Sequence, residues 1–315
     1  MLQKPRSQRY PLFYSILGTL LLSSIGLAAP NDIYLLGLVD KETGAPDQEA
    51  FARFTTELGL VATPSPLQPA ETTGQAGFDF GVDMTLHSIS VWEDYWKDGR
   101  VGTALEGREP FIPTLQTVGV RGRKGFIFPV PLTSELELGA NWIMESSMLT
   151  VGGNLKVALN EGFRWIPDLA VMIGVNRLVG AEALDLTTAT AGGSISKGFG
   201  FFGDVNLCPF ISYQSVFINA SSRILDPDPT NTNDVGNTFT FETIPMVRAN
   251  NNNASQCAAD FVNCLDMNRF DRLSLGLRGN VSIVQISGGV DLNYLPRNVQ
   301  FPVMVQAALR FGLLF

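Results

Sequence analysis

The sequence has few charged residues, one histidine and three cysteines. Only 17% of its 315 residues are charged, whereas a typical soluble domain has about 25%. A water-facing surface built from this chain would therefore be unusually poor in charge. The formal net charge of −8 argues against a nucleic-acid partner, because phosphates attract positive charge. The apolar fraction of 45% is ample for a folded core and excludes general disorder.

The scarcity of cysteine and histidine leaves little material for a metal site. Cys257 and Cys264 lie in a segment rich in Asn and Asp, and in an oxidising compartment we expect them to form one small loop disulfide. Cys208 lies in an alternating apolar stretch and would stay free. No CxxC motif occurs, and the histidine is distant in sequence from the cysteines. We therefore expect no metal site and no cofactor, with a calcium or ligand site in the loop of residues 222–268 as an alternative.

The first residues have the layout of a secretory signal peptide. Lys4, Arg6 and Arg9 precede an uncharged stretch from Tyr10 to Leu27, and small residues end it at Ala29. A membrane anchor would need about 20 apolar residues, and this stretch is short, so cleavage after Ala29 is favoured. Loss of three positive charges would give an exported protein of net charge −8 − 3 = −11.

After Leu60 the sequence consists mainly of short runs that alternate apolar and polar residues. In the last run every odd position from Phe301 to Phe315 is apolar, while Gln306 and Arg310 lie between them. Period-two alternation predicts β-strands with two different faces, and the six clearest apolar faces contain no charged residue. Ten strands are predicted, at residues 76–90, 112–124, 130–143, 148–160, 168–179, 186–197, 202–221, 269–280, 283–295 and 300–315.

The apolar faces could point to a protein core or to lipid. A soluble barrel or sandwich would cover its other face with Lys and Glu, but the polar faces here are mostly Gly, Ser, Thr, Asn and Gln. A charge on the lipid side costs about 2 to 4 kcal/mol at the midplane, which explains its absence there. We therefore expect an all-β, closed antiparallel transmembrane barrel, since only closure satisfies strand edges in lipid. Twelve strands are the alternative, if Thr238 to Val247 pairs with an extended seventh strand.

Connection lengths agree with a membrane barrel. If the first strand runs outward, the long connections at residues 91–111 and 222–268 both fall on the outer side, and the turns below are short. The predicted organisation is a signal peptide at 1–29, a periplasmic segment with a short helix and a Pro-rich linker at 30–75, and the barrel at 76–315.

The terminal strand QAALRFGLLF resembles those of bacterial outer-membrane β-barrel proteins. Their last strand typically ends in Phe with apolar residues at alternate positions, and Phe311, Leu313 and Phe315 match. The resemblance covers about residues 76–315 and departs at Arg310, where a Gly is often found. It implies a bacterial outer-membrane location, a lipid-bilayer environment and recognition of this end by the barrel-insertion machinery. It implies no activity.

Strand parity predicts which side chains face the lumen. They carry both signs of charge in similar number, which suits either a polar pathway with mild selectivity or a ladder of ion pairs that closes a narrow barrel. Barrels of about eight strands are filled by side chains and those of 16 to 18 leave a channel, so ten lie near the closed end. The predicted luminal residues are Asp79, Asp83, His87, Arg121, Arg123, Glu135, Glu137, Lys156, Asp204, Arg272, Arg278, Asp291 and Arg310.

His87 is the one candidate for catalysis. It follows Asp83 by four residues near the outer end of the first strand, whereas omptin-type barrel proteases place their His two residues after an acid. Barrel phospholipases pair a His with a Ser nucleophile, and the spacing singles out no Ser here. We expect the protein not to be an enzyme.

A short helix is predicted before the barrel. Pro46 to Glu49 precede Phe51, Phe54 and Leu58 at helical spacing, with Gly59 after them and three prolines in the following linker. This segment would plug the lumen or lie under the lower rim. The predicted function is a narrow channel or uptake route for small solutes. The alternative is a structural or surface-display barrel that binds an unknown surface ligand through its long outer loops.

Overall fold

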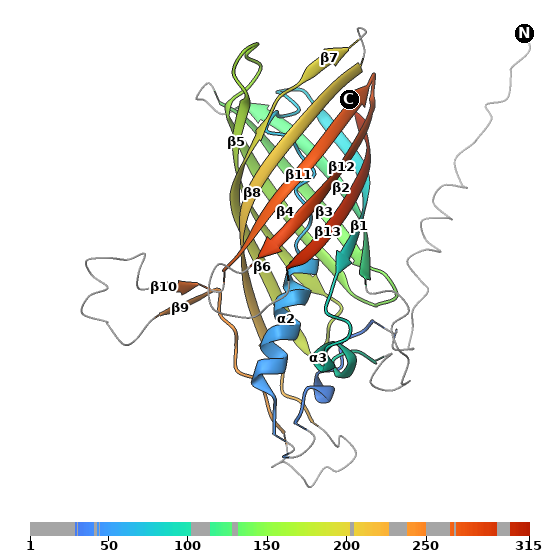
Figure 1. Ribbon diagram of the computed structural model, residues 1–315, viewed down its shortest axis with the longest axis vertical. Coiled ribbons are helices and arrows are strands. Elements are labelled where there is room, and N and C mark those ends of the chain that lie inside the picture. The colour runs from blue at the N-terminus through green and yellow to red at the C-terminus, as the bar shows by residue number, and fades with distance from the viewer. Residues whose placement is uncertain are drawn as a thin grey trace, which may run out of the picture.

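The computed structural model describes residues 29, 31–40, 43, 45–101, 114–127, 132–201, 205–226, 238–249, 265–267, 269–294 and 303–315. Ten of its strands form a closed antiparallel barrel (Figure 1). They are β1 (Phe78–Ser88), β2 (Thr114–Ile127), β3 (Thr133–Ile143), β4 (Leu149–Asn160), β5 (Asp168–Val179), β6 (Leu184–Ser196), β8 (Val205–Ser222), β11 (Arg269–Val281), β12 (Val284–Tyr294) and β13 (Met304–Leu314). The predicted fold class and strand number are confirmed.

Each barrel strand pairs with its neighbours in the chain, and β13 closes the barrel against β1. A short strand β7 (Phe199–Phe201) extends the β6–β8 hairpin, and β9 (Val247–Ala249) pairs with β10 (Leu265–Met267) in a separate sheet. The twelve-strand alternative is wrong. Residues 238–247 form no barrel strand beside β8. Their backbone pairing there consists of isolated bridges, Ala220 with Ile244 and Leu225 with Phe239.

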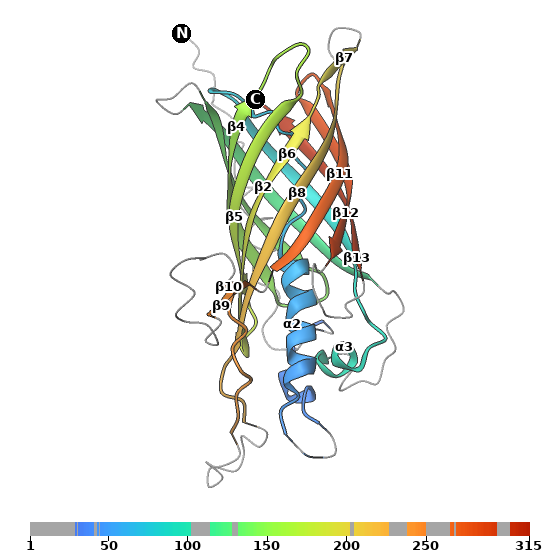
Figure 2. The same cartoon turned by 60° about the vertical axis from the view of Figure 1, so that its left-hand side comes forward.

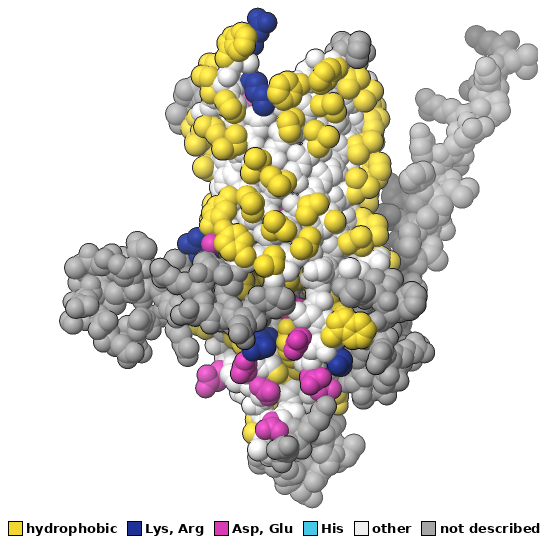
Figure 3. Space-filling view, in the orientation of Figure 1, with side chains coloured by type: hydrophobic (Ala, Val, Ile, Leu, Met, Phe, Trp, Pro, Cys, Tyr) yellow, Lys and Arg dark blue, Asp and Glu magenta, His cyan; other side chains and the backbone are white. Residues whose placement is uncertain are grey.

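The outside of the barrel is apolar and the inside is polar. In β5 the side chains alternate strictly between buried and exposed along all twelve residues, and its exposed residues include Ile173 and Val175. On the face in Figure 3, hydrophobic side chains cover the barrel, whereas Asp and Glu gather beyond one end. This surface suits hydrocarbon, where polar backbone groups must be paired within the barrel.

The two ends of the barrel differ. At one end β1 starts beside the chain terminus, where Phe78 and Phe315 exchange backbone hydrogen bonds; we call it the C-terminal end. At the other end lie the connections β1–β2 (residues 89–113) and β8–β11 (residues 223–268), together with the helices α2 (Gln48–Ala62) and α3 (Asp94–Asp98) (Figures 1 and 2). We call it the cap end.

Helix α2 begins where the sequence indicates and ends later. The carboxylate of Asp47 accepts hydrogen bonds from the amides of Glu49 and Ala50, which caps the first turn. The predicted end at Gly59 is wrong, since the helix continues to Ala62. Gly59 is a packing residue, because a Cβ there would lie 2.7 Å from Ile218 Cδ1. Among the described residues, no helix is long and apolar enough to span a membrane.

The predicted position of residues 30–75 conflicts with the predicted sidedness of the loops. The sequence indicated a periplasmic segment and outer long connections, but α2 and the long connections share the cap end (Figure 2). A further 3-10 helix, η1 (Leu35–Gly37), packs there as well. The two predictions cannot both hold, because the barrel separates its two ends by a membrane.

Candidate functional site

The linker after α2 lies inside the barrel. Residues 63–77, which we call the luminal segment, lead from α2 at the cap end to β1 at the C-terminal end. Residues Ser65 to Ala70 are all buried. The hydroxyl of Thr63 lies 3.0 Å from that of Thr188 on β6, and the amide of Ala70 donates to Ser196 at the other end of the same strand. The helix therefore covers the lumen and the linker fills it.

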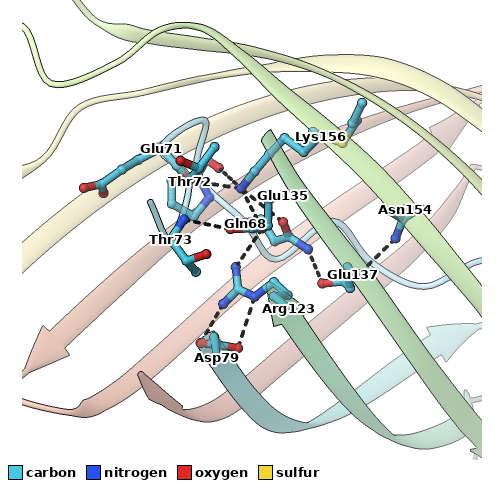
Figure 4. Close-up of polar contacts among 12 residues, drawn as sticks. Gln68, Glu71, Thr72, Thr73, Asp79, Arg123, Glu135, Glu137, Asn154 and Lys156 are labelled. Atoms are coloured by element: carbon cyan, nitrogen blue, oxygen red, sulfur yellow. Dashed lines mark hydrogen bonds and ion pairs between the residues drawn. The ribbon is translucent and has the colours of Figure 1, made fainter. Parts of the chain in front are cut away.

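Charged side chains of the barrel wall bind the main chain of the luminal segment. Arg121 donates to the carbonyl of Ser65 at 3.1 Å. Lys156 donates to the carbonyls of Pro69 at 3.2 Å and Glu71 at 3.0 Å. Glu135 accepts from the amide of Thr73 at 2.9 Å (Figure 4). These bonds satisfy backbone groups that would otherwise be buried without partners.

Arg272 fastens the end of α2 to the barrel. Its guanidinium donates to the carbonyls of Leu60, Thr63 and Pro64 at 2.9 to 3.1 Å, and to Asn293 Oδ1 at 2.7 Å. The last carbonyls of a helix lack intrahelical partners and carry partial negative charge, so a cation placed there is stabilising. Asp291, near enough to attract Arg272, supplies an opposite charge.

Below Arg272, alternating charges link the first strands to the last one. Asp79 pairs with Arg123 and Arg310, Asp83 pairs with Arg121 at 2.7 Å, and Lys156 pairs with Glu135 at 3.0 Å. Register places Asp79 directly opposite Arg123. Asp83 lies opposite Arg310 in the register but binds Arg121. Buried charges must be paired, and here the partners come from adjacent strands.

The sequence-predicted luminal residues lie inside the barrel wherever the structure describes them. Those in the prediction with described side chains are at most 5% exposed: Asp79, Asp83, His87, Arg121, Arg123, Glu135, Glu137, Lys156, Arg272, Arg278, Asp291 and Arg310. Phe311, Leu313 and Phe315 face outward. Asp204 and the predicted disulfide between Cys257 and Cys264 lie outside the described residues.

His87 is not paired with the acid nearest to it in sequence. Its Nε2 lies 3.0 Å from the hydroxyl of Thr117 on β2, while Asp83 binds Arg121. The expectation that the protein is not an enzyme stays a prediction.

The luminal segment is a part of the site that was not predicted from the sequence. Gln68 binds Glu137 and Lys156, Glu71 pairs with Arg278, and Thr72 binds Glu161. A signal was present in the three prolines of the linker, because proline has no amide hydrogen. A segment with few backbone amide donors leaves fewer unpaired groups when it is buried without a strand beside it, so its burial costs less free energy.

A small cavity adjoins the luminal segment. Among the described residues, a cavity of about 20 Å³ lies between the luminal segment and the walls of β4, β5, β6 and β8. Its lining includes Pro64, Gln68, Lys156 and Gln214. A volume of this size holds about one water molecule.

The cap end has an apolar core of its own. Phe51 stacks on Phe241 with ring centroids 4.4 Å apart, and Phe54 packs against Trp96 at 4.8 Å. Glu57 is buried beneath them and accepts hydrogen bonds from the hydroxyl of Tyr95 and the indole of Trp96. The helix is thereby held over the barrel mouth by packing and by hydrogen bonds.

Tyr95 should stay protonated where ordinary tyrosines ionise. Burial, followed by its hydrogen bond to Glu57, raises the pKa of the Tyr95 hydroxyl. A raised pKa means that the hydroxyl stabilises the cap fully below the unfolded-state pKa of about 10 and loses this contribution at higher pH. When tyrosine ionisation is followed by ultraviolet absorbance, the wild-type protein and Tyr95→Phe should differ only at pH values above the range in which ordinary tyrosines ionise. A difference within that range would contradict the enclosed position of Tyr95.

A closed antiparallel barrel with an apolar exterior and a charged interior is the fold of bacterial outer-membrane β-barrel proteins, and this chain has it. No protein-family model matches the chain, and no curated protein matches it.

Solved structures similar to the chain include three such barrels. The translocator domain of autotransporter NalP from Neisseria meningitidis is 9% identical, with 78% of this chain and 89% of that chain covered and a TM-score of 0.34. An outer membrane channel from Pseudomonas putida F1 is 12% identical, covering 80% and 99%, with a TM-score of 0.33. LpxR from Salmonella typhimurium is 9% identical, covering 75% and 100%, with a TM-score of 0.31. These similarities concern the fold alone.

Proposed function

We propose that the protein is a closed barrel of the bacterial outer membrane that displays a folded cap and does not conduct solutes. The cap consists of α2, α3 and the described parts of the long connections around them. In this function the barrel is a scaffold, and the cap and long connections meet a partner in the surroundings. The apolar exterior contacts the lipid bilayer, and the terminal residues Phe311 to Phe315 serve the insertion machinery.

The occupation of the lumen carries this proposal. The luminal segment is bound by Arg121, Lys156 and Glu135 through its main chain, and α2 is fastened above it by Arg272. A solute would have to displace a segment of the protein itself. The buried ion pairs also favour a closed lumen, because separating them costs several kcal/mol.

A narrow channel is the second candidate, and the polar wall of the lumen favours it. Serine, threonine, asparagine and charged side chains line the inner faces, which would suit water and small solutes once the luminal segment had left. The channel therefore requires a gated state in which residues 63–77 move.

Conductance in a planar bilayer separates the two candidates. Because the luminal segment fills the barrel, the mature full-length protein should give no current above that of bare lipid. Steady single-channel openings of the unmodified protein would remove the closed-barrel proposal and favour solute passage. A well-folded state of the sample is checked beforehand by the heat-dependent mobility of the barrel in SDS gels.

A further inference from the structure

The path of the chain places α2 across the membrane from the start of β1. Strand β1 begins at the C-terminal end, beside Phe315, and runs to the cap end, where Ser88 leads into the connection that contains α3. The luminal segment runs the opposite way inside the barrel, from α2 to Phe78 (Figure 1). Helix α2 and the residues at the start of β1 are therefore separated by the full height of the barrel.

The connection lengths indicate which end is outside. Membrane barrels of this type have short periplasmic turns and longer outer loops. The connections at the C-terminal end include residues 161–167 and 282–283, whereas those at the cap end include 89–113 and 223–268. By this criterion the cap end is the outer end, and α2 lies outside.

Helix α2 has no route through lipid. It carries Glu49, Arg53 and Glu57, and charged groups in the hydrocarbon layer cost several kcal/mol each. The interior of the barrel is polar and already encloses the chain that follows the helix. A route through the lumen, or closure of the barrel around the chain, avoids exposing these charges to lipid.

Besides the side-chain bonds of Gln68, Glu71 and Thr72, the wall of the lumen binds the main chain of the luminal segment at many points. Arg272, Arg121 and Lys156 donate to carbonyls of Leu60, Thr63, Pro64, Ser65, Pro69 and Glu71, and wall oxygens accept from the amides of Ala70, Thr72 and Thr73. Every residue has a carbonyl, and every residue except proline has an amide. The donors and acceptors of the wall can therefore bind the backbone carbonyls and amides of an extended polypeptide.

We propose that the lumen is a binding track for an extended polypeptide main chain, and that this barrel uses it to bring its own residues 30–62 to the outer surface. The luminal segment is the part that remains on the track. The proposal rests on the proposed function for its outer-membrane setting. It differs from the expectation of a periplasmic segment at residues 30–75, because it places residues 30–62 outside.

Cysteine labelling of the full-length protein in intact cells tests the sidedness. In a background with Cys208→Ser, Cys257→Ser and Cys264→Ser, Glu49→Cys places a thiol on α2, where the Glu49 side chain is 75% exposed. Trp165→Cys places a matched control thiol at the C-terminal end, where Trp165 is 86% exposed. A membrane-impermeant maleimide should label Glu49→Cys in intact cells and Trp165→Cys only after the outer membrane is permeabilised. The reverse order, or protection of both sites in intact cells, would overturn the proposal.

A disulfide across the lumen tests the route. The double variant Thr63→Cys with Thr188→Cys replaces two hydroxyls that lie 3.0 Å apart. Oxidation should join the two new thiols in protein that is also labelled at the surface. Neither single variant should form this cross-link. Surface labelling without this cross-link would overturn passage through the lumen. Gln68→Ala should keep the cross-link, because wall residues hold the main chain, and its loss would overturn the main-chain track. A conducting but correctly labelled protein would remove the closed-barrel function and leave this proposal intact.

Discussion

Arg272→Met is expected to loosen α2 over the barrel mouth and to produce intermittent conductance in a barrel that we expect to be silent without the substitution. The variant loses every hydrogen bond from the guanidinium to Leu60, Thr63 and Pro64. The carbonyls of Thr63 and Pro64 lose this partner, whereas that of Leu60 keeps its bond from Gln306. Each bond to a charged group contributes about 1.5 to 3 kcal/mol. The substitution thus removes three such bonds at the contact between helix and barrel. Single-channel recording in planar bilayers measures it.

The double variant Arg272→Met with Asp291→Leu is the control for uncompensated charge. Arg272→Met alone leaves Asp291 without its nearby cation, and neither of its carboxylate oxygens has a hydrogen-bond partner in the described structure. If the burial of a lone carboxylate causes the effect, the double variant should be silent again. If anchoring of α2 causes it, as we expect, conductance should persist in the double variant.

Asp79→Ala is expected to weaken the barrel itself. Asp79 is fully buried and pairs with both Arg123 and Arg310, so its removal leaves two buried guanidinium groups with reduced compensation. Breaking a buried pair in this way costs about 3 to 5 kcal/mol. The folded, fast-migrating form in SDS gels should convert to the unfolded form at a clearly lower temperature than in the unmodified protein.

Asp185→Ala is the matched control for Asp79→Ala. Asp185 also pairs with two arginines, Arg177 and Arg223, but all three side chains are exposed at 43% or more. Exposed pairs contribute about 0 to 1 kcal/mol. The melting temperature of this variant should stay close to that of the unmodified protein, and an equal loss in both variants would mean that burial of the Asp79 cluster is unimportant for stability.

The barrel strands were predictable because period-two alternation and lipid act on each strand separately. The predicted strand at residues 168–179 coincides with β5, and the predicted strand at 269–280 differs from β11 by one residue. Parity also indicated that Arg310 points inward. Its departure from the terminal-strand pattern has a physical reason, since it binds Asp79 across the β1–β13 seam.

The contents of the lumen were less predictable. Three prolines indicated a linker but not its partners, because those partners come from strands far along the chain. Gly59 resembled a helix stop in sequence, whereas its missing side chain makes room for Ile218 of β8. Predictions about Cys257 and Cys264 fall outside the described residues.

The sequence by itself determined the strands, their lipid-facing sides and the set of charges turned inward, because each follows from alternation within a short stretch of chain. Only the tertiary structure decided that residues 63–77 occupy the lumen and that α2 lies with the long connections. Closure of β13 against β1 creates the enclosed space, and the luminal segment fits there because charges from separate strands meet its backbone. Such matches exist only in three dimensions, where residues 60 and 272 become neighbours.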